Sequence, residues 1–199
     1  MDKTVDNSLE QQLKKVKSDI KFVIFCLVLV FIVFAIVILN TVVYFNVRVK
    51  QSSMEPTVYE NDMLVANKLK TAKVGDVVII ENMEEYLLIK RVIAVEGQTV
   101  EIKNGAVYVD GSLLEETYLP NGVVTDTKGS VLSWTVGEGQ VFFLGDNRAV
   151  SRDSRTMGTC KTTDIIGVVE PWSISTKGIR NFFYNIYASV AGFFGASVD

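Results

Sequence analysis

Residues 86–95 read YLLIKRVIAV, and this ten-residue stretch decides the fold. It is apolar at odd and at even positions, so a strand formed here would be buried on both faces. Lys90 shares the face of Leu88 and Val92, and Arg91 takes the opposite face. Two interpretations of these charges are open. Both side chains reach water at the edge of the strand, or Lys90 is desolvated, which lowers its pKa and yields a neutral amine that can act as a base.

Short β-branched and aliphatic runs flank this stretch on both sides. They occupy residues 63–66, 77–80, 99–102, 107–109, 131–136, 141–144 and 165–169. Asn104-Gly105 and Asp110-Gly111 are strong signals for hairpin turns between such runs. No long amphipathic helix is expected between residues 51 and 177. The pattern predicts a mostly β fold built on antiparallel sheet, with enough residues for one core.

An unbroken apolar run of 18 residues, 22–39, precedes the β region. At about 1.5 Å per residue, roughly 20 residues cross the hydrocarbon core of a bilayer. A cleaved signal peptide is the alternative, but its apolar region has roughly 7–15 residues followed by small residues. This run instead continues into Tyr44 and Phe45. We therefore expect an uncleaved transmembrane anchor over residues 22–47 and a β domain over residues 48–177.

Basic residues near the two ends of the run predict its orientation. Arg48 and Lys50 follow it closely, whereas four lysines precede it: Lys14, Lys15, Lys17 and Lys21. This asymmetry predicts a single-pass protein of the cell membrane, with residues 1–21 as a cytoplasmic tail and the β domain on the extracytoplasmic side.

Both ends of the chain have helical patterns. Ser8 and Gln11 fit a capping box, and we interpret residues 1–21 as an extension of the membrane helix rather than a helix that binds a partner. The C-terminal segment, residues 178–199, is amphipathic. Its aromatic part, 182–194, is too short to span a membrane comfortably. It is either a helix packed on the sheet or an interfacial helix lying on the bilayer.

The composition excludes several classes of function. The 199-residue chain has no histidine, so it has neither a Ser-His-Asp mechanism nor a His-ligated metal site. Two cysteines, Cys26 and Cys160, cannot form an all-cysteine zinc site or a disulfide framework. A net charge of −3 disfavours nucleic-acid binding. We expect no metal, no cofactor and no nucleic-acid partner, and the mean hydropathy of +0.27 agrees with a membrane segment.

Two further stretches suggest chemistry, although each also has an ordinary structural explanation. Residues 51–57, QSSMEPT, place two serines before a proline that restricts the backbone; such a sequence is commonly a loop. Residues 145–155, GDNRAVSRDSR, combine two Asp and three Arg. They form either a solvated turn with weak ion pairs or a rigid scaffold under a site. With no histidine present, a lysine is the natural base for a serine nucleophile.

The order of these stretches resembles type I signal peptidases, over about residues 20–170. The motifs are Ser53-Met54-x-Pro56-Thr57, Lys90-Arg91-Val92, and Gly145-Asp146-Asn147-Arg148 followed by Ser151, Asp153, Ser154 and Arg155. The resemblance implies a mostly β, membrane-anchored serine protease. It would remove signal peptides from exported preproteins on the outer side of the cytoplasmic membrane, at sites with small residues of the A-x-A type.

The resemblance also implies roles for individual residues. Ser53 is the nucleophile, Lys90 is the general base and Ser151 orients Lys90. The Ser53 backbone N–H is one oxyanion donor, and Met54 is assigned to substrate binding. The positions that match structural residues near the site are Asp146, Arg148, Asp153 and Arg155.

Three features depart from the family pattern. Gln51 stands where the family usually has Gly or Ser, so its amide either donates to the oxyanion or narrows the cleft. Ala149-Val150 replaces a frequent Asp-Asn pair. Residues 104–138, the place of the family's variable subdomain, are short, as in the Gram-positive type.

Other functions remain open at this point. The main alternative is a non-proteolytic relative that acts as an assembly factor or chaperone for pilus proteins. A self-cleaving repressor-type protease is soluble and binds DNA, and the apolar run and acidic charge fit neither property. Expected partners are preprotein signal peptides, the lipid bilayer, and the secretion translocon or pilus assembly proteins.

Overall fold

The chain divides into two compact units, residues 1–43 and residues 44–199. The computed structural model describes residues 3–81, 87–127, 132–176, 178, 179, 181 and 186. The first unit is a helix and the second is a β domain, and each is described by itself.

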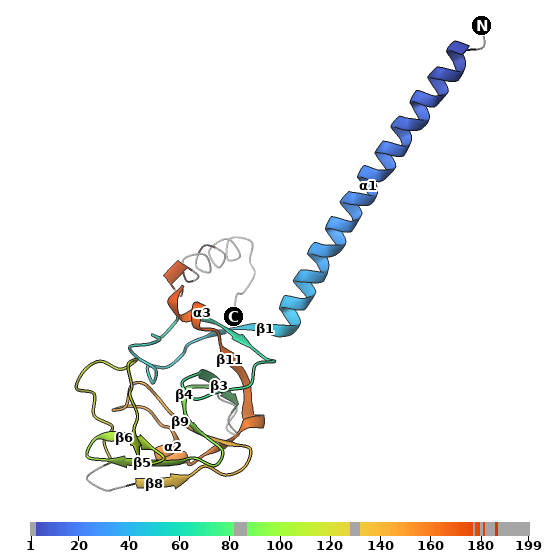
Figure 1. Cartoon of the computed structure of the whole chain (residues 1–199). Coiled ribbons are helices and arrows are strands. Elements are labelled where there is room, and N and C mark those ends of the chain that lie inside the picture. Colours follow the sequence, from blue (N-terminus) through green and yellow to red (C-terminus); the bar gives the residue numbers. More distant parts are fainter. Residues whose placement is uncertain are drawn as a thin grey trace. The chain divides into compact units, whose positions relative to one another are not determined.

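Helix α1 (Lys3–Val43) forms the first unit (Figure 1). Its segment Lys14–Val43 is long and apolar enough to be a candidate membrane span, and none of its apolar window is buried within the structure. The prediction that residues 1–21 extend this helix is confirmed from Lys3 onward. Ser8 therefore lies inside the helix rather than at its N-terminal cap.

The helix ends at Val43, before the end of the predicted anchor. Tyr44–Arg48 forms strand β1, which pairs antiparallel with β2 (Met63–Asn67). The prediction of a membrane anchor over residues 22–47 is therefore wrong for residues 44–47. A lipid-facing helix and a half-buried strand are both apolar, and the aromatic and β-branched residues at this end favour the strand.

A seven-stranded antiparallel sheet forms the larger part of the β domain, with the order β1-β2-β11-β3-β4-β9-β10. Its further strands are β3 (Val77–Glu81), β4 (Leu87–Val95), β9 (Gln140–Leu144), β10 (Cys160–Lys161) and β11 (Ile165–Val169). Strand β4 lies between β3 and β9, and six consecutive residues in it are buried. This confirms the expectation that the strand is covered on both faces.

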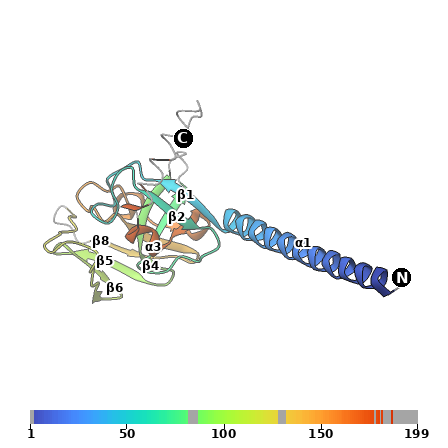
Figure 2. The same ribbon diagram turned by 90° about the horizontal axis from the view of Figure 1, so that it is seen from above.

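A four-stranded sheet forms the rest, in the order β7-β6-β5-β8. Its strands are β5 (Thr99–Lys103), β6 (Ala106–Val109), β7 (Ser112–Leu113) and β8 (Leu132–Thr135). Asn104-Gly105 and Asp110-Gly111 connect its hairpins with φ values of 53°, 79°, 50° and 78°. Positive φ at both central residues is what a type I′ turn requires, so both turn predictions are confirmed. Figures 1 and 2 place β5, β6 and β8 together at the end of the domain away from β1.

Every predicted strand range contains an observed strand. Strands β1, β7 and β10 were not predicted, and β7 and β10 have only two residues each. The helices in the described part of residues 51–177 are three to five residues long: α2 (Ser154–Met157), η1 (Thr162–Asp164) and α3 (Pro171–Ser175). The absence of a long helical pattern predicts this.

Three clusters of buried apolar residues hold the sheets together, and β4 contributes to each of them. Ile89 packs with Leu64 and Ile79 on one side of the large sheet. Val92 packs with Phe143 in a second cluster. Ile93 and Ala94 pack with residues of the small sheet in the third. Because β4 joins all three clusters, its backbone is fixed along its whole length.

The C-terminal segment contacts the β domain at one described residue. Asn181 accepts a hydrogen bond from the Met63 N–H and donates one to Asp62 Oδ1, each at 2.9 Å. At this point the segment packs on the sheet. Most of residues 182–194 lies outside the described residues, so the choice between a packed and an interfacial helix stays a prediction there.

Candidate active site

Ser53 lies in the loop between β1 and β2, at the start of a tight turn. The Glu55 N–H donates to the Ser52 carbonyl at 3.1 Å, and the Val58 N–H donates to the Met54 carbonyl at 3.0 Å. The Met54 side chain is only 1% exposed and packs in the core beneath the turn. Met54 thus anchors the turn that carries Ser53, and the structure buries it away from the surface that a substrate would contact.

Lys90 projects from the middle of β4 toward that serine. Its side chain is 1% exposed, and Nζ lies 2.7 Å from Ser53 Oγ. Of the two interpretations of this lysine, the one with a side chain reaching water at the strand's edge is wrong. Strand β4 is an interior strand between β3 and β9, so Lys90 does not lie at a sheet edge, and the turn that carries Ser53 packs against its amine.

Burial changes the acidity of this amine. It lowers the pKa of Lys90 from 10.5 to about 8, because a charged ammonium is poorly solvated there. The carboxylates of Asp153 and Asp146 oppose the shift, and the Arg155 charge adds to it. Within the described part of the chain, no carboxylate forms an ion pair with Lys90. A substantial fraction of neutral amine is therefore present at mildly alkaline pH.

A pocket of about 560 Å³ opens beside the two side chains. Gln51 and Ser52 line it next to Ser53, and Leu88 lines it next to Lys90. Its other lining residues are Lys50, Glu60, Val150, Arg152 and Met157. The pocket therefore gives access to the side of the site that carries Ser53 and Lys90.

The charged loop, residues 145–155, is a scaffold and not a solvated turn. Asp146, Arg148 and Asp153 are all buried. Asp153 accepts a hydrogen bond from the Gly145 N–H at 3.0 Å and pairs with the Arg155 guanidinium. Arg155 also donates to the Arg148 carbonyl at 2.8 Å. These contacts join both ends of the loop to each other.

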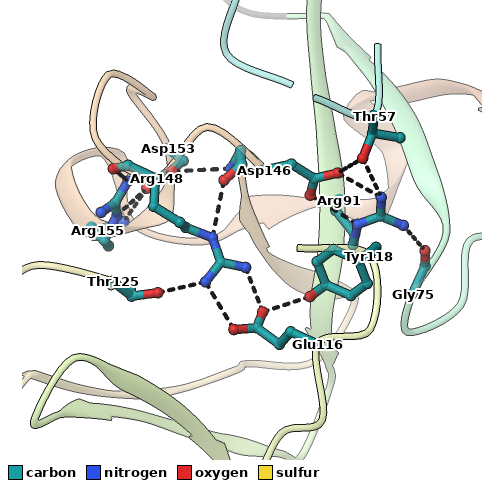
Figure 3. A network of polar contacts seen from close by, with 11 residues as sticks. Thr57, Gly75, Arg91, Glu116, Tyr118, Thr125, Asp146, Arg148, Asp153 and Arg155 are labelled. Atoms are coloured by element: carbon teal, nitrogen blue, oxygen red, sulfur yellow. Dashed lines mark hydrogen bonds and ion pairs between the residues drawn. The ribbon is translucent and has the colours of Figure 1, made fainter. Parts of the chain in front are cut away.

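Arg91 ties the same loop to β4 (Figure 3). Its Nε and Nη2 donate to the two carboxylate oxygens of Asp146 at 2.9 and 2.6 Å. Thr57 Oγ1 donates to Asp146 at 2.5 Å, and Arg91 Nη1 donates to the Gly75 carbonyl at 2.8 Å. The residue beside Lys90 thus fixes the loop that approaches Ser53.

The loop also holds the serine directly. The Asn147 N–H donates to the Ser53 carbonyl at 3.0 Å, and Asn147 Nδ2 donates to the Ser52 carbonyl at 3.1 Å. A Cβ at Gly145 would lie 2.1 Å from Ser151 Oγ and 2.5 Å from the Ser53 carbonyl oxygen. Only glycine therefore fits between these two serines.

Two predicted residues lie at the site without a direct contact to the dyad atoms. Ser151 Oγ is buried, and within the described residues it has no hydrogen-bond partner, so it makes no hydrogen bond to Lys90. Gln51 is exposed and lines the pocket. The Ser53 backbone N–H makes no hydrogen bond within the described part of the chain, and it remains available to a ligand.

Five residues at or near this site were given no individual role from the sequence, although Thr57 and Asn147 lie within the quoted motifs: Thr57, Glu116, Tyr118, Thr125 and Asn147. They join the network through contacts between distant parts of the chain. No spacing rule reveals such contacts in a single sequence. Within the described residues, no group of acidic or cysteine side chains could hold a metal ion.

Known proteins resemble this chain over the same region. The family model described as "Signal peptidase, peptidase S26" matches residues 20–173. "Signal peptidase I V" of Bacillus subtilis is 33% identical over 152 residues, which cover 69% of this chain and 90% of the relative. "Probable signal peptidase I-1" of Synechocystis is 37% identical over 132 residues, which cover 60% of this chain and 65% of the relative.

A solved structure is also similar. The crystal structure of a signal peptidase I from Enterococcus faecalis has 30% sequence identity and a TM-score of 0.45, covering 51% of this chain and 98% of that chain. "Signal peptidase IB" of Staphylococcus aureus is 32% identical over 140 residues, covering 61% of this chain and 73% of the relative.

Proposed function

The chain belongs to the peptidase S26 family of signal peptidases and is a serine endopeptidase, and from this premise we propose that Ser53 and Lys90 are its catalytic dyad. The observation that carries the proposal is the 2.7 Å contact between Ser53 Oγ and a buried Lys90 amine. A lysine held for structure alone would pair with a carboxylate or reach water.

The proposed reaction has two halves. The neutral Lys90 amine takes the proton from Ser53 Oγ, and the oxygen attacks the carbonyl of the residue before the cleavage site. The resulting ammonium gives its proton to the leaving amine, so the peptide bond breaks and an ester to Ser53 remains. Lys90 then takes a proton from water as the water oxygen attacks the ester. The Lys90 ammonium returns this proton to Ser53 Oγ as the ester bond breaks, and the product leaves as a carboxylic acid that ionises in solvent.

The Ser53 N–H is the proposed donor to the tetrahedral oxyanion. The absence of a partner for this N–H within the described residues supports the assignment. Gln51 is proposed as a second donor, because its amide side chain is exposed at the pocket. Ser151 is proposed to orient Lys90 once substrate is bound, since its buried hydroxyl has no other partner in the described part of the chain. The four charged residues of the loop are proposed to hold this arrangement.

The proposed substrates are signal peptides of exported preproteins, cut after small residues of the A-x-A type. The relatives in Bacillus and Staphylococcus confirm the resemblance to the Gram-positive type. The helical residues 22–43 are proposed as a membrane anchor with a cytoplasmic N-terminus and an extracytoplasmic catalytic domain. Such an anchor raises the effective concentration of enzyme toward a membrane-bound substrate. Residues 104–138 are proposed as the short variable subdomain. Contacts with a translocon or pilus proteins stay predictions.

A cell-free cleavage assay tests the proposal. The full chain in detergent is incubated with a labelled preprotein, and the product is identified by N-terminal sequencing. The wild type is expected to release a mature N-terminus after a small residue, and Ser53→Ala to release none. Ser52→Ala is the matched control, because it removes the neighbouring hydroxyl, and it should keep most of the activity. Wild-type cleavage by Ser53→Ala would refute the assignment, and a wild type without cleavage would favour an assembly factor.

A further inference from the structure

The connection between β7 and β8 reaches from the small sheet into the network beneath the candidate site (Figure 3). Glu116 lies in this connection. Its carboxylate accepts from Arg148 Nη1 at 3.0 Å and also pairs with Arg148 Nη2. Thr125, further along the same connection, accepts from Arg148 Nη1 at 2.5 Å. The Arg148 side chain has no exposed surface, so these residues supply the partners that its buried charge requires.

Tyr118 makes a second link to the site. Its hydroxyl donates to Glu116 at 2.6 Å, and its ring lies 3.8 Å from the Arg91 guanidinium. Figure 3 shows the ring beside the guanidinium that also holds Asp146. A guanidinium over a tyrosine face in a desolvated place is held by a cation–π attraction as well as by its ion pair. Arg91 directly follows Lys90 in β4. A contact that fixes the Arg91 side chain therefore also restrains the backbone next to Lys90.

The two links form a closed circuit. From Glu116, one branch passes through Arg148 to the Gly145 carbonyl, to which Arg148 Nε donates at 3.0 Å. The other branch passes through Tyr118 and Arg91 to the Asp146 carboxylate. Both branches end on neighbouring residues of the charged loop. That loop carries the groups that hold Ser53 in place.

We propose that Glu116 and Tyr118 are positioning residues for the Ser53–Lys90 pair, an inference that rests on the proposed function. They act through Arg148 and Arg91 and touch neither reacting atom. The small sheet then has a catalytic purpose, because its β7–β8 connection keeps the loop closed against Ser53 and keeps water away from Lys90.

Loss of this circuit has a defined consequence at Lys90. The groups facing its amine are the Ser53 hydroxyl and, at longer range, the carboxylates of Asp146 and Asp153 and the Arg155 guanidinium. Desolvation is the largest influence on the amine. A loosened loop admits water, which stabilises the ammonium and moves the pKa of Lys90 back up. The acidic limb of the rate profile then moves to higher pH.

The test compares Glu116→Gln and Tyr118→Phe with Glu115→Gln in the full chain in detergent, using a peptide with an A-x-A site. Glu115 is the exposed neighbour of Glu116, and its variant makes the same change of charge outside the network. We expect Glu116→Gln to lower kcat ~10-fold with KM within about twofold of wild type. The midpoint of the acidic limb of its pH–rate profile should move to higher pH by ~0.5 unit or more. Tyr118→Phe should change both quantities in the same direction by less, and Glu115→Gln should match wild type.

The outcomes separate positioning from mere stability. If Glu116→Gln and Tyr118→Phe are folded and keep the wild-type kcat and acidic limb, the inference is overturned. If Glu116→Gln does not fold, Tyr118→Phe decides, because it keeps the ring over Arg91 and removes only the hydroxyl; a wild-type profile then overturns the inference and a shifted limb supports it. A wild type that cleaves nothing refutes the proposed function itself, whereas wild-type cleavage with unaffected variants refutes only the role of Glu116 and Tyr118.

Discussion

The two faces of strand β4 each carry a buried cationic side chain, and the partners of these side chains differ. Arg91 is 7% exposed, and Asp146 binds its guanidinium with both carboxylate oxygens. Lys90 is 1% exposed, and its amine contacts the Ser53 hydroxyl and no carboxylate of the described residues. Burial is nearly the same on both faces and the partners differ. The paired arginine therefore connects β4 to the charged loop, whereas burial without a paired carboxylate favours the neutral form of the lysine.

The largest expected effect is a loss of cleavage activity when Lys90 is replaced by an arginine, the residue found on the opposite face of β4. Lys90→Arg keeps a positive charge but cannot supply a free amine, because a guanidinium does not lose its proton in proteins. We expect preprotein cleavage to fall at least ~10³-fold, as for Lys90→Met. Initial rates in detergent measure this loss. Lys103→Arg, in β5 of the small sheet, is the control, and a rate for Lys90→Arg within tenfold of wild type would contradict the assignment.

The opposite experiment removes the partner on the arginine face. Asp146→Asn leaves the Arg91 charge buried without its carboxylate, which typically costs about 3–5 kcal/mol of stability. For a domain of this size we expect Tm to fall by about 10 °C, as measured by circular dichroism. Glu101→Gln breaks a partly exposed pair with Lys103 instead and should cost less than ~1 kcal/mol. Equal shifts for the two variants would show that burial of the Arg91 pair does not matter.

A third effect follows from the lowered pKa of Lys90. Because this pKa is about 8 in the folded state and 10.5 without burial, the unfolded chain binds more protons between these values. The wild type should therefore become more stable with rising pH across that window, and below it the buried charge costs about 3 kcal/mol. Lys90→Met lacks this dependence. Its free energy of unfolding should exceed that of the wild type most below pH 8, and a difference that is constant with pH would exclude the linkage.

The smallest expected effect concerns the packing of the charged loop against Ser53, on the side of β4 that carries Lys90. Gly145→Ala places a methyl group against Ser151 Oγ and the Ser53 carbonyl, which should cost about 1–3 kcal/mol and reduce kcat. Gly137→Ala is the matched control, because its Cβ would meet only the flexible end of Gln140 at 3.2 Å. Thermal unfolding and cleavage rates measure both. If the two variants have the same Tm and the same cleavage rate, close packing at Gly145 is not required by the site.

Much of the β domain could be predicted because its strands follow local patterns. Apart from Lys90 and Arg91, residues 86–95 are apolar on both faces, and Asn104-Gly105 is a residue pair that favours a type I′ turn. Strand β1 was missed because its residues continue the apolar run of the helix. The contacts of Ser53 with Lys90 were expected only from the order of motifs. Those of Glu116 with Arg148 were not expected, because they connect residues 32 positions apart and depend on how the two sheets pack.

The sequence by itself determined which residues can do the chemistry. A chain without histidine that has a serine before a proline turn and a lysine inside an apolar strand has few other options. Only the tertiary structure decided that Lys90 is desolvated while Arg91 is paired, since both are cations in one strand. The free energy of a buried charge depends on the groups that surround it in space, and those groups come from a distant loop and from the small sheet.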